Sequence, residues 1–279
     1  MRDSITVQRV RVPSLMYGTA WKEDRTEKLV GLALRAGFRA IDTANQRKHY
    51  VEAGVGAAVA ASGVPRAELF LQTKYTYARG QDHRLPYDPA APIASQVRQS
   101  LESSLVHLGV DYLDALLLHG PWAGHGWTDQ DRQAWQAMEA LQHEQRTRLI
   151  GVSNVSLEQL TTLAQAAHVV PAFVQNRCYA RTGWDRDVRD FCRAHHIVYQ
   201  GFSLLTANGR ELAGPRVTAM ARRLDATVAQ VVFRFAQAVG MLPLSGTSDP
   251  VHMQQDLAST PLELDGEDIA VLEGIGERR

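Results

Sequence analysis

Short apolar runs alternate with longer amphipathic segments along almost the whole chain. Eight runs have the composition of buried strands, and they cover residues 15–18, 39–42, 69–74, 114–119, 149–154, 172–176, 198–203 and 242–247. Between them apolar residues recur every three or four positions, as in Ile93, Val97, Leu101 and Leu105, which is the period of a helix with one buried face. This alternation predicts a parallel sheet covered by helices.

The number of these units favours one closed barrel. Eight strand-plus-helix units fit a (β/α)8 TIM barrel, which needs roughly 250 residues, better than an open doubly wound sheet. A dinucleotide-binding sheet of that second kind carries G-x-G-x-x-G after its first strand, whereas this chain has Gly18-Thr19-Ala20-Trp21 there. We therefore predict a single domain over residues 1–279, with a β-hairpin within residues 1–14 that caps the barrel bottom.

Ionisable side chains stand at the ends of three successive predicted strands. Asp42, Lys74 and His119 occupy these ends, and Tyr50 follows the first of them within a few residues. A capping box at Ser156-Leu-Glu-Gln159 begins the helix after the fifth strand, so that Asn154 lies in the loop before it. Because the carboxyl ends of barrel strands meet at one mouth, these side chains are expected to face a common site.

Composition narrows the classes of ligand and partner. Thirty basic residues balance thirty acidic residues, so no global field favours nucleic acid or an anionic membrane. No apolar run approaches the roughly 20 residues that cross a bilayer, and no spacing typical of a metal site occurs. We expect a cytoplasmic monomer that acts on a small molecule and keeps Cys178 and Cys192 as reduced thiols.

Several motifs in a fixed order resemble the aldo-keto reductases, a family of nicotinamide-dependent carbonyl reductases built on the same barrel. The matching segments are Gly18-Thr19, Gly37-Phe-Arg-Ala-Ile-Asp-Thr-Ala44, Thr73-Lys74, Leu117-Leu-His-Gly-Pro121, Gly151-Val-Ser-Asn154, Val174-Gln175 and Phe202-Ser-Leu-Leu205. The resemblance implies reduction of an aldehyde or ketone to an alcohol with NAD(P)H.

The resemblance also implies a catalytic tetrad of Asp42, Tyr50, Lys74 and His119. A phenol has an ordinary pKa of about 10, so it needs help to act as a general acid near neutral pH. The expected help is the Lys74 ammonium, which would lower the pKa of Tyr50, while Asp42 holds Lys74 in place. His119, neutral in so apolar a strand, would orient the substrate carbonyl.

The loop before the tyrosine departs from the family pattern. The usual spacing Asp-Thr-Ala-x-x-Tyr would place the tyrosine at Arg47, whereas Tyr50 comes three positions later. Counting back from Val55-Gly56, which resembles the family's Val-Gly pair, gives His49 or Tyr50. We favour Tyr50 as the proton donor, with His49 as the alternative and Tyr75 and Tyr77 as further hydroxyls nearby.

A second set of residues is expected to bind the cofactor. Ser153, Asn154 and Gln175 resemble the polar set that binds the nicotinamide carboxamide, and Phe202 occupies the position of the aromatic ring that stacks on the nicotinamide. The remaining positions assigned to the cofactor are Gly18, Thr19, Ser203, Leu205, Ser245, Gly246, Thr247 and Gln254.

The choice between NADPH and NADH is set at the adenosine end. Many relatives carry a lysine and an arginine for the 2′-phosphate where this chain has Leu244 and Pro250. The alternative hydrogen-bond donors to this phosphate are Ser245, Thr247 and Ser248, together with the amides of a helix that starts after Asp249. We favour NADPH, with NADH as the alternative.

Two other functions fit the same barrel. The altered tyrosine loop is compatible with a regulatory or cofactor-binding protein that has lost most of its turnover. A non-reductive reaction, such as an isomerisation or a dehydration in a biosynthetic pathway, is also compatible with the motifs. The carbonyl reductase is the function that we favour.

Overall fold

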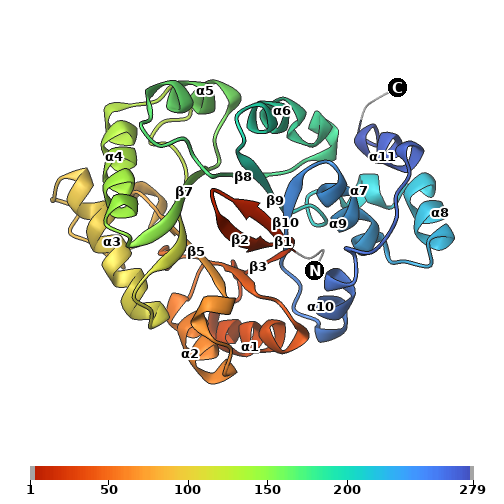
Figure 1. Ribbon diagram of the computed structural model, residues 1–279, viewed down its shortest axis with the longest axis horizontal. Helices are drawn as coiled ribbons and strands as arrows, with labels where there is room; N and C mark the ends of the chain where they lie inside the picture. Colours follow the sequence, from red (N-terminus) through yellow and green to blue (C-terminus); the bar gives the residue numbers. More distant parts are fainter. Residues whose placement is uncertain (1–3, 277–279) are drawn as a thin grey trace.

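Eight parallel strands close into a barrel in the computed structural model, which describes residues 4–276 (Figure 1). Around the barrel the neighbours follow the order β10-β3-β4-β5-β6-β7-β8-β9. The strands are β3 (Met16–Gly18), β4 (Ala40–Asp42), β5 (Phe70–Tyr75), β6 (Leu113–Leu118), β7 (Thr147–Ser153), β8 (Phe173–Arg177), β9 (Val198–Phe202) and β10 (Met241–Ser245). The predicted TIM barrel is confirmed, and each predicted strand lies within two residues of an observed one.

Helices surround the barrel and connect its strands. They are α1 (Thr26–Ala36), α2 (Glu52–Ser62), α3 (Ile93–Leu108), α4 (Asp129–His143), α5 (Leu157–Ala166), α6 (Arg186–Ala194), α7 (Gly209–Leu212), α8 (Pro215–Arg223), α9 (Val228–Ala238), α10 (Pro250–Leu257) and α11 (Gly266–Glu273). The predicted capping box at Ser156 and Gln159 is present at the start of α5. Among residues 4–276, no helix is both long and apolar enough to cross a membrane.

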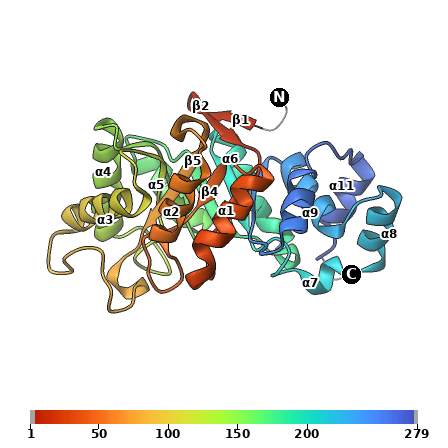
Figure 2. The ribbon, with the colours of Figure 1, turned by 90° about the horizontal axis from the view of Figure 1, so that it is seen from below.

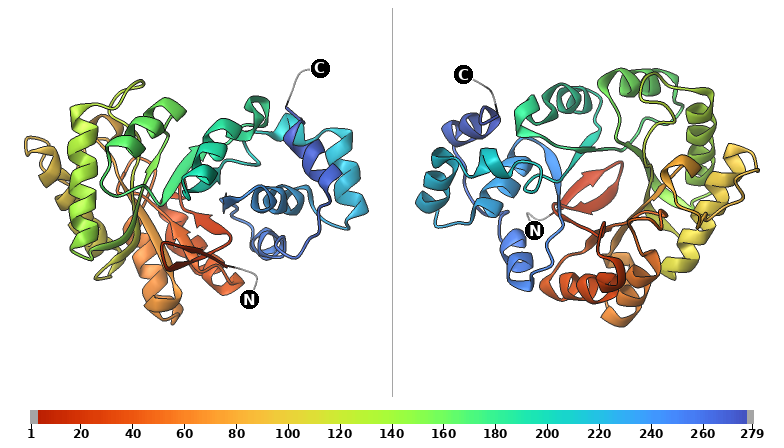
Figure 3. Two further views of the ribbon diagram at one scale, coloured as in Figure 1. Left: turned by 45° about the horizontal axis from the view of Figure 1, so that its top comes forward. Right: turned by 180° about the vertical axis from the view of Figure 1, so that it is seen from behind.

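Helix α8, helix α9 and helix α11 form a group on one side of the ring (Figures 1 and 3). On another side, α2 packs against α3 at a glycine. A Cβ on Gly56 would lie 2.2 Å from the backbone oxygen of His107, so no larger residue fits at this crossing without a backbone shift. The close packing fixes α2, which begins directly after the segment that contains Tyr50.

A β-hairpin occupies one end of the barrel. Strand β1 (Ser4–Val7) pairs antiparallel with β2 (Val10–Pro13), and Val7 and Val12 are buried. Figure 2 shows the hairpin at the end opposite α7. The expected hairpin and single domain also include residues 1–3, and the domain includes residues 277–279, all of which lie outside the described residues.

The barrel interior changes from apolar to polar along its axis. Near the hairpin, Phe70 and Phe173 meet edge to face with their ring centroids 5.9 Å apart, in a cluster that also includes Met16 and Leu117. Two residues further along β5 the interior residue is Gln72, which is fully buried. Large apolar side chains therefore close one end, and hydrogen-bonding side chains begin where the strands approach the other.

Candidate active site

The three residues predicted at strand ends, together with Tyr50, lie at the mouth opposite the hairpin. Asp42 ends β4, Lys74 lies in β5 and His119 directly follows β6. Tyr50 comes from the segment before α2, and its ring centroid is 5.4 Å from Lys74 Nζ and 5.9 Å from that of His119. Side chains from four separate segments thus converge on one point.

A buried ion pair forms the base of this group. Lys74 Nζ donates to Asp42 Oδ1 at 2.6 Å, to Asp42 Oδ2 at 2.8 Å and to the Thr43 backbone oxygen at 2.8 Å. The side chains of Lys74 and Asp42 are only 1% and 4% exposed. Burial lowers the pKa of Lys74, and the Asp42 carboxylate opposes that shift.

Glutamine side chains surround the carboxylate of this pair. Gln72 Nε2 and Gln175 Nε2 donate to Asp42 Oδ1 at 2.7 and 3.0 Å. Both amides also donate to Gln200 Oε1 at 2.8 Å, and Gln200 Nε2 donates back to Gln72 Oε1 at 2.9 Å. These donors stabilise the charged carboxylate and fix its orientation at the barrel axis.

A single helical turn accommodates the longer loop before Tyr50. The amides of His49 and Tyr50 both donate to the Gln46 oxygen, at 3.2 and 3.1 Å. Neighbouring segments hold this turn, since Gln81 Nε2 donates to the Asn45 oxygen and Arg84 donates to the Arg47 oxygen, both at 2.7 Å. The extra residues are therefore compacted into a turn, and Tyr50 still reaches the mouth.

The environment of Tyr50 shifts its pKa in the direction opposite to our prediction. Burial is the main cause and raises the pKa of Tyr50, and the nearby Asp42 carboxylate raises it further. The expected lowering of this pKa is not found, because the burial of the phenol dominates the shift. Tyr50 consequently holds its proton at neutral pH, and its hydroxyl makes no hydrogen bond to any residue in the described part of the chain.

His119 is neutral at the same point. Burial lowers the pKa of His119 to about 3, with a further contribution from Lys74, in agreement with the predicted neutral imidazole. Its Nδ1 lies 2.6 Å from the Thr76 hydroxyl, and the Asn154 side chain donates to its backbone oxygen at 2.7 Å. These contacts fix the ring and leave Nε2 available at the mouth.

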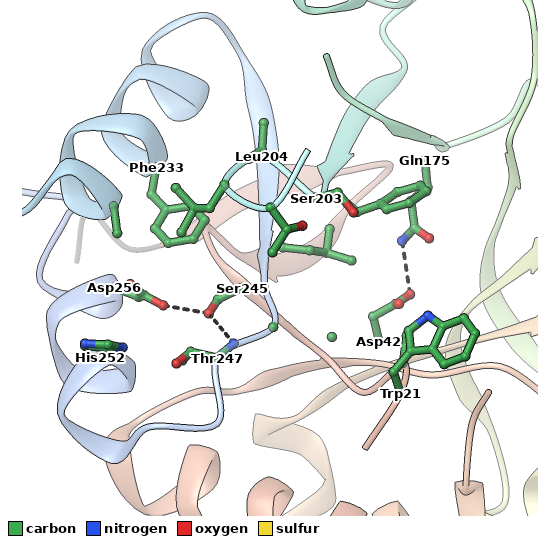
Figure 4. Close-up of a pocket in the computed structure, with 18 of the residues that line it drawn as sticks. Trp21, Asp42, Gln175, Ser203, Leu204, Phe233, Ser245, Thr247, His252 and Asp256 are labelled. Atoms are coloured by element: carbon green, nitrogen blue, oxygen red, sulfur yellow. Dashed lines mark hydrogen bonds between the residues drawn. The ribbon is translucent and has the colours of Figure 1, made fainter. Parts of the chain in front are cut away.

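A cavity of about 560 Å³ extends from the tetrad toward α10 (Figure 4). Asp42, Tyr50 and His119 line one end, and Ser245, Thr247 and Asp256 line the other. The predicted cofactor residues that line it are Gly18, Ser153, Asn154, Gln175, Phe202, Ser203, Leu205, Ser245, Gly246 and Thr247. A cavity of this volume, lined by a phenol, an imidazole and several polar side chains, has room for a small-molecule ligand.

Residues 15–277 match the model of the aldo/keto reductase family. The chain belongs to this family. Among its curated relatives is an aldo-keto reductase of Mycolicibacterium vanbaalenii, 36% identical over 251 residues, which are 90% of this chain and 83% of the relative. An aldo-keto reductase of Mycobacterium tuberculosis is 33% identical over 95% of this chain and 88% of its own length. The chain is therefore an oxidoreductase of this family.

Solved structures agree with this assignment. An aldo/keto reductase of Brucella melitensis superposes with a TM-score of 0.84 at 27% identity, over 98% of both chains. An aldo-keto reductase of the silkworm Bombyx mori, described as complexed with NADPH, has a TM-score of 0.84 at 24% identity over 99% of this chain and 88% of that one. At 24% identity, the similarity to the silkworm enzyme shows that the two proteins share a fold.

The alternative proton donors of this aldo-keto reductase are engaged elsewhere. The His49 ring lies against Trp21, with centroids 3.6 Å apart, and does not line the cavity. The Tyr75 hydroxyl donates to Gln96 at 3.2 Å, and the Tyr77 hydroxyl donates to Asp131 at 3.0 Å. Of the candidate hydroxyl and imidazole groups in this region, Tyr50 and His119 are the two that face the cavity.

Two residues assigned to the cofactor lie outside the cavity. Thr19 is fully buried, and its hydroxyl and amide both donate to the Asp42 backbone oxygen, at 2.9 and 3.0 Å. Gln254 is exposed on α10, and the adjacent Gln255 lines the cavity together with His252. In a helix, residues three and four positions after His252 lie on the same face as His252. Helical spacing therefore predicts that Gln255 and Asp256, and not Gln254, share the face that lines the cavity.

The start of α10 differs from the anion site that we expected. The side chain of Asp249 accepts hydrogen bonds from the amides of Val251 at 2.7 Å and His252 at 3.3 Å. These amides are therefore already paired with a carboxylate. Deeper in the cavity, burial raises the pKa of Asp256 to about 6, and its Oδ2 accepts from the Ser245 hydroxyl at 2.6 Å (Figure 4).

Sequence reasoning also missed a buried carboxylate behind the tetrad. Glu52, the first residue of α2, accepts from the hydroxyl of Thr73, which adjoins Lys74 in β5, and from Ser104 at 3.1 Å. His107 Nδ1 lies 3.2 Å from its second oxygen. The position of Glu52 at a helix N-terminus resembles an ordinary favourable charge, and only the fold reveals its partners.

Proposed function

We propose that this aldo-keto reductase reduces an aldehyde or ketone to an alcohol with NADPH, and that Tyr50 donates the proton. The single observation that carries the proposal is the Tyr50 hydroxyl, which is protonated and without a partner among the described residues. It belongs to a group that includes a neutral imidazole and a buried ammonium, at one end of an elongated cavity. A carbonyl oxygen placed there would meet the Tyr50 hydroxyl and, in the tautomer in which His119 accepts from Thr76 at Nδ1, an Nε2–H donor.

The nicotinamide end of the cavity fits the proposed cofactor. The Asn154 and Gln175 side-chain oxygens line the cavity and accept no hydrogen bond from any described residue, so they can accept from a carboxamide group. Phe202 supplies an aromatic face on the same wall. When bound, the cofactor supplies a hydride to the carbonyl carbon.

The chain's own residues then control the proton. His119 orients the substrate oxygen from its cavity-facing nitrogen, because its other nitrogen is held by Thr76. Tyr50 transfers its proton to the oxygen as negative charge develops there. The raised pKa of Tyr50 means that the phenolate left behind needs stabilisation, and the Lys74 ammonium, held by Asp42, is the cation available for it.

NADH is the alternative cofactor, because of the residues near the part of the cavity where the adenosine of the cofactor would bind. The silkworm relative supports NADPH, whereas the carboxylates of Asp249 and Asp256 would disfavour its 2′-phosphate. We further propose that the protein acts as a cytoplasmic monomer, where its two cysteines remain free thiols. Cys178 and Cys192 are both unpaired and buried, which is consistent with a reducing compartment.

The proposal is tested by measuring the loss of nicotinamide absorbance on addition of a panel of aldehydes. Wild type and Tyr50→Phe are compared. Tyr50→Phe should lower kcat by about 10²- to 10⁴-fold, as expected for loss of a general acid. Cofactor binding, followed by tryptophan fluorescence, should survive, because the phenyl ring keeps its place. Undiminished reduction by Tyr50→Phe would refute the assigned donor, and failure to bind either dinucleotide would refute the reductase.

A further inference from the structure

A second cavity adjoins the first at the proposed catalytic histidine. It has a volume of about 380 Å³, and His119 and Asn154 line both cavities. The remaining lining comes from the loops after β4, β5 and β6 and from α5, and includes Gln46, Tyr77, Arg79 and Gly120. A substrate whose carbonyl lies at His119 can therefore extend its other end into this space.

Arg79 is the one ionised side chain among the residues that line the second cavity. His119 is neutral, since burial and the nearby Lys74 hold its pKa far below neutrality. One guanidinium nitrogen of Arg79 donates to the Pro121 backbone oxygen at 2.5 Å, and its carbon lies 5.4 Å from the centre of the Trp122 ring. These two contacts hold the side chain across the loops.

The charge of Arg79 has no acidic partner within the part of the chain that the structure describes. Its Nε and second terminal nitrogen donate to no described residue. The nearby carboxylate of Asp131 is occupied, because it accepts from the Tyr77 hydroxyl, the Trp122 amide and the amide and hydroxyl of Thr128. An arginine with free donors beside an otherwise uncharged cavity favours an anion.

Backbone groups in the same wall add further donors. Gly120, Ala123 and Gly124 line this cavity, and their amides donate to no acceptor among residues 4–276. Loop amides without partners commonly bind anions together with a cationic side chain. This observation is independent of the arginine and points to the same ligand chemistry.

We propose that the preferred substrate is an aldehyde or ketone with a carboxylate at its far end, and that Arg79 binds this carboxylate. The inference rests on the proposed carbonyl reduction and adds the class of substrate. A carboxylate suits the planar guanidinium, which offers two parallel donors to two oxygens. Since the contact persists from bound substrate through the reaction, its loss should appear in KM more than in kcat.

A matched pair of aldehydes tests the proposal with the full-length protein. 4-Carboxybenzaldehyde and methyl 4-formylbenzoate differ in charge at the far end and little in size. Wild type should favour the acid, and Arg79→Gln should lower kcat/KM for the acid by about 10- to 100-fold while leaving the ester within about twofold. Arg98→Gln, an exposed arginine paired with Glu144 on the outer face, is the control and should change neither value.

Two further measurements separate the possible failures. Calorimetry with the alcohol product 4-(hydroxymethyl)benzoate reports anion binding without turnover, so weaker binding by Arg79→Gln supports the inference even if reduction fails. Equal binding by both proteins overturns it, as does an equal loss of activity on acid and ester. Preference for glyceraldehyde 3-phosphate over glyceraldehyde, without preference for the carboxylate, would also overturn it and assign the site to phosphate.

Discussion

Substitution of Asp42 and substitution of Lys74, the two members of the buried ion pair, should lower the stability of the protein by different amounts. Asp42→Ala removes both hydrogen bonds from Lys74, of 2.6 and 2.8 Å, and those from the Gln72 and Gln175 amides. It leaves a buried ammonium with the Thr43 oxygen as its remaining acceptor. Lys74→Met leaves a carboxylate that still accepts from Gln72 and Gln175. We therefore expect Asp42→Ala to destabilise the protein more than Lys74→Met.

The magnitudes follow from the cost of an unpaired buried charge. Loss of one partner of a buried pair costs about 3–5 kcal/mol, and we place Asp42→Ala at about 4 kcal/mol and Lys74→Met at about 2 kcal/mol. At about 2–4 °C per kcal/mol, the melting temperature should fall by roughly 10 °C and 5 °C. The double variant Asp42→Ala/Lys74→Met should be more stable than Asp42→Ala alone, because it buries no unpaired charge.

The loss in Asp42→Ala should depend on pH. Burial already lowers the pKa of Lys74 below its ordinary value of 10.5, and without Asp42 the opposing effect disappears. The unfolded chain then binds more protons than the folded chain between the lowered pKa and 10.5, so the free energy of unfolding rises with pH in that window. The destabilisation of Asp42→Ala should therefore shrink as the pH approaches 10.

Urea denaturation followed by circular dichroism, at several pH values between 7 and about 10, measures these differences. Wild type and the double variant serve as references at each pH, which removes the pH dependence of other groups. Equal losses in the two single variants, simple additivity in the double variant, or a loss that does not change with pH would refute the reasoning.

Two buried carboxylates outside the tetrad give further predictions. Because burial raises the pKa of Asp256 to about 6, the folded state binds this proton more tightly, and stability should fall as the pH rises from about 4 to 7. Asp256→Asn should remove on the order of 2 kcal/mol of that decline, measured by urea unfolding. Glu52→Ala should cost about 2–3 kcal/mol, because it leaves Thr73, Ser104 and His107 without their acceptor. Glu52→Gln should recover most of this loss, and equal melting temperatures for the two variants would contradict the assignment.

The barrel and the position of the tetrad could be predicted because both depend on local patterns. Each strand is a short apolar run, and the polar residue at its end is read directly from the sequence. Asp42, Lys74 and His119 therefore appear in register without any knowledge of long-range contacts. Tyr50 required an additional inference, and the structure accounts for its position by the turn that starts at Gln46.

Other features of the site could not be predicted, because they depend on contacts between segments far apart in the chain. Gln72 and Gln200 are 128 residues apart, and each alone resembles a single polar residue within an apolar strand. The pKa of Tyr50 was predicted in the wrong direction because the burial of its phenol, the largest cause of the shift, depends on packing that the sequence does not display. Similarly, the free donors of Arg79 become evident only when the loops after β5 and β6 are brought together.

The hydrogen-bond network formed by three buried glutamines and Asp42 has a consequence for how the protein folds. Gln72, Gln175 and Gln200 come from β5, β8 and β9, and with Asp42 from β4 they form one network across the barrel axis. Until the ring of strands has closed, no member has its full set of partners. In a folding intermediate with an open barrel, these amides would be either hydrated or without hydrogen-bond partners. Enzyme activity should therefore return during refolding only when the last strand pairs with the first and the barrel closes.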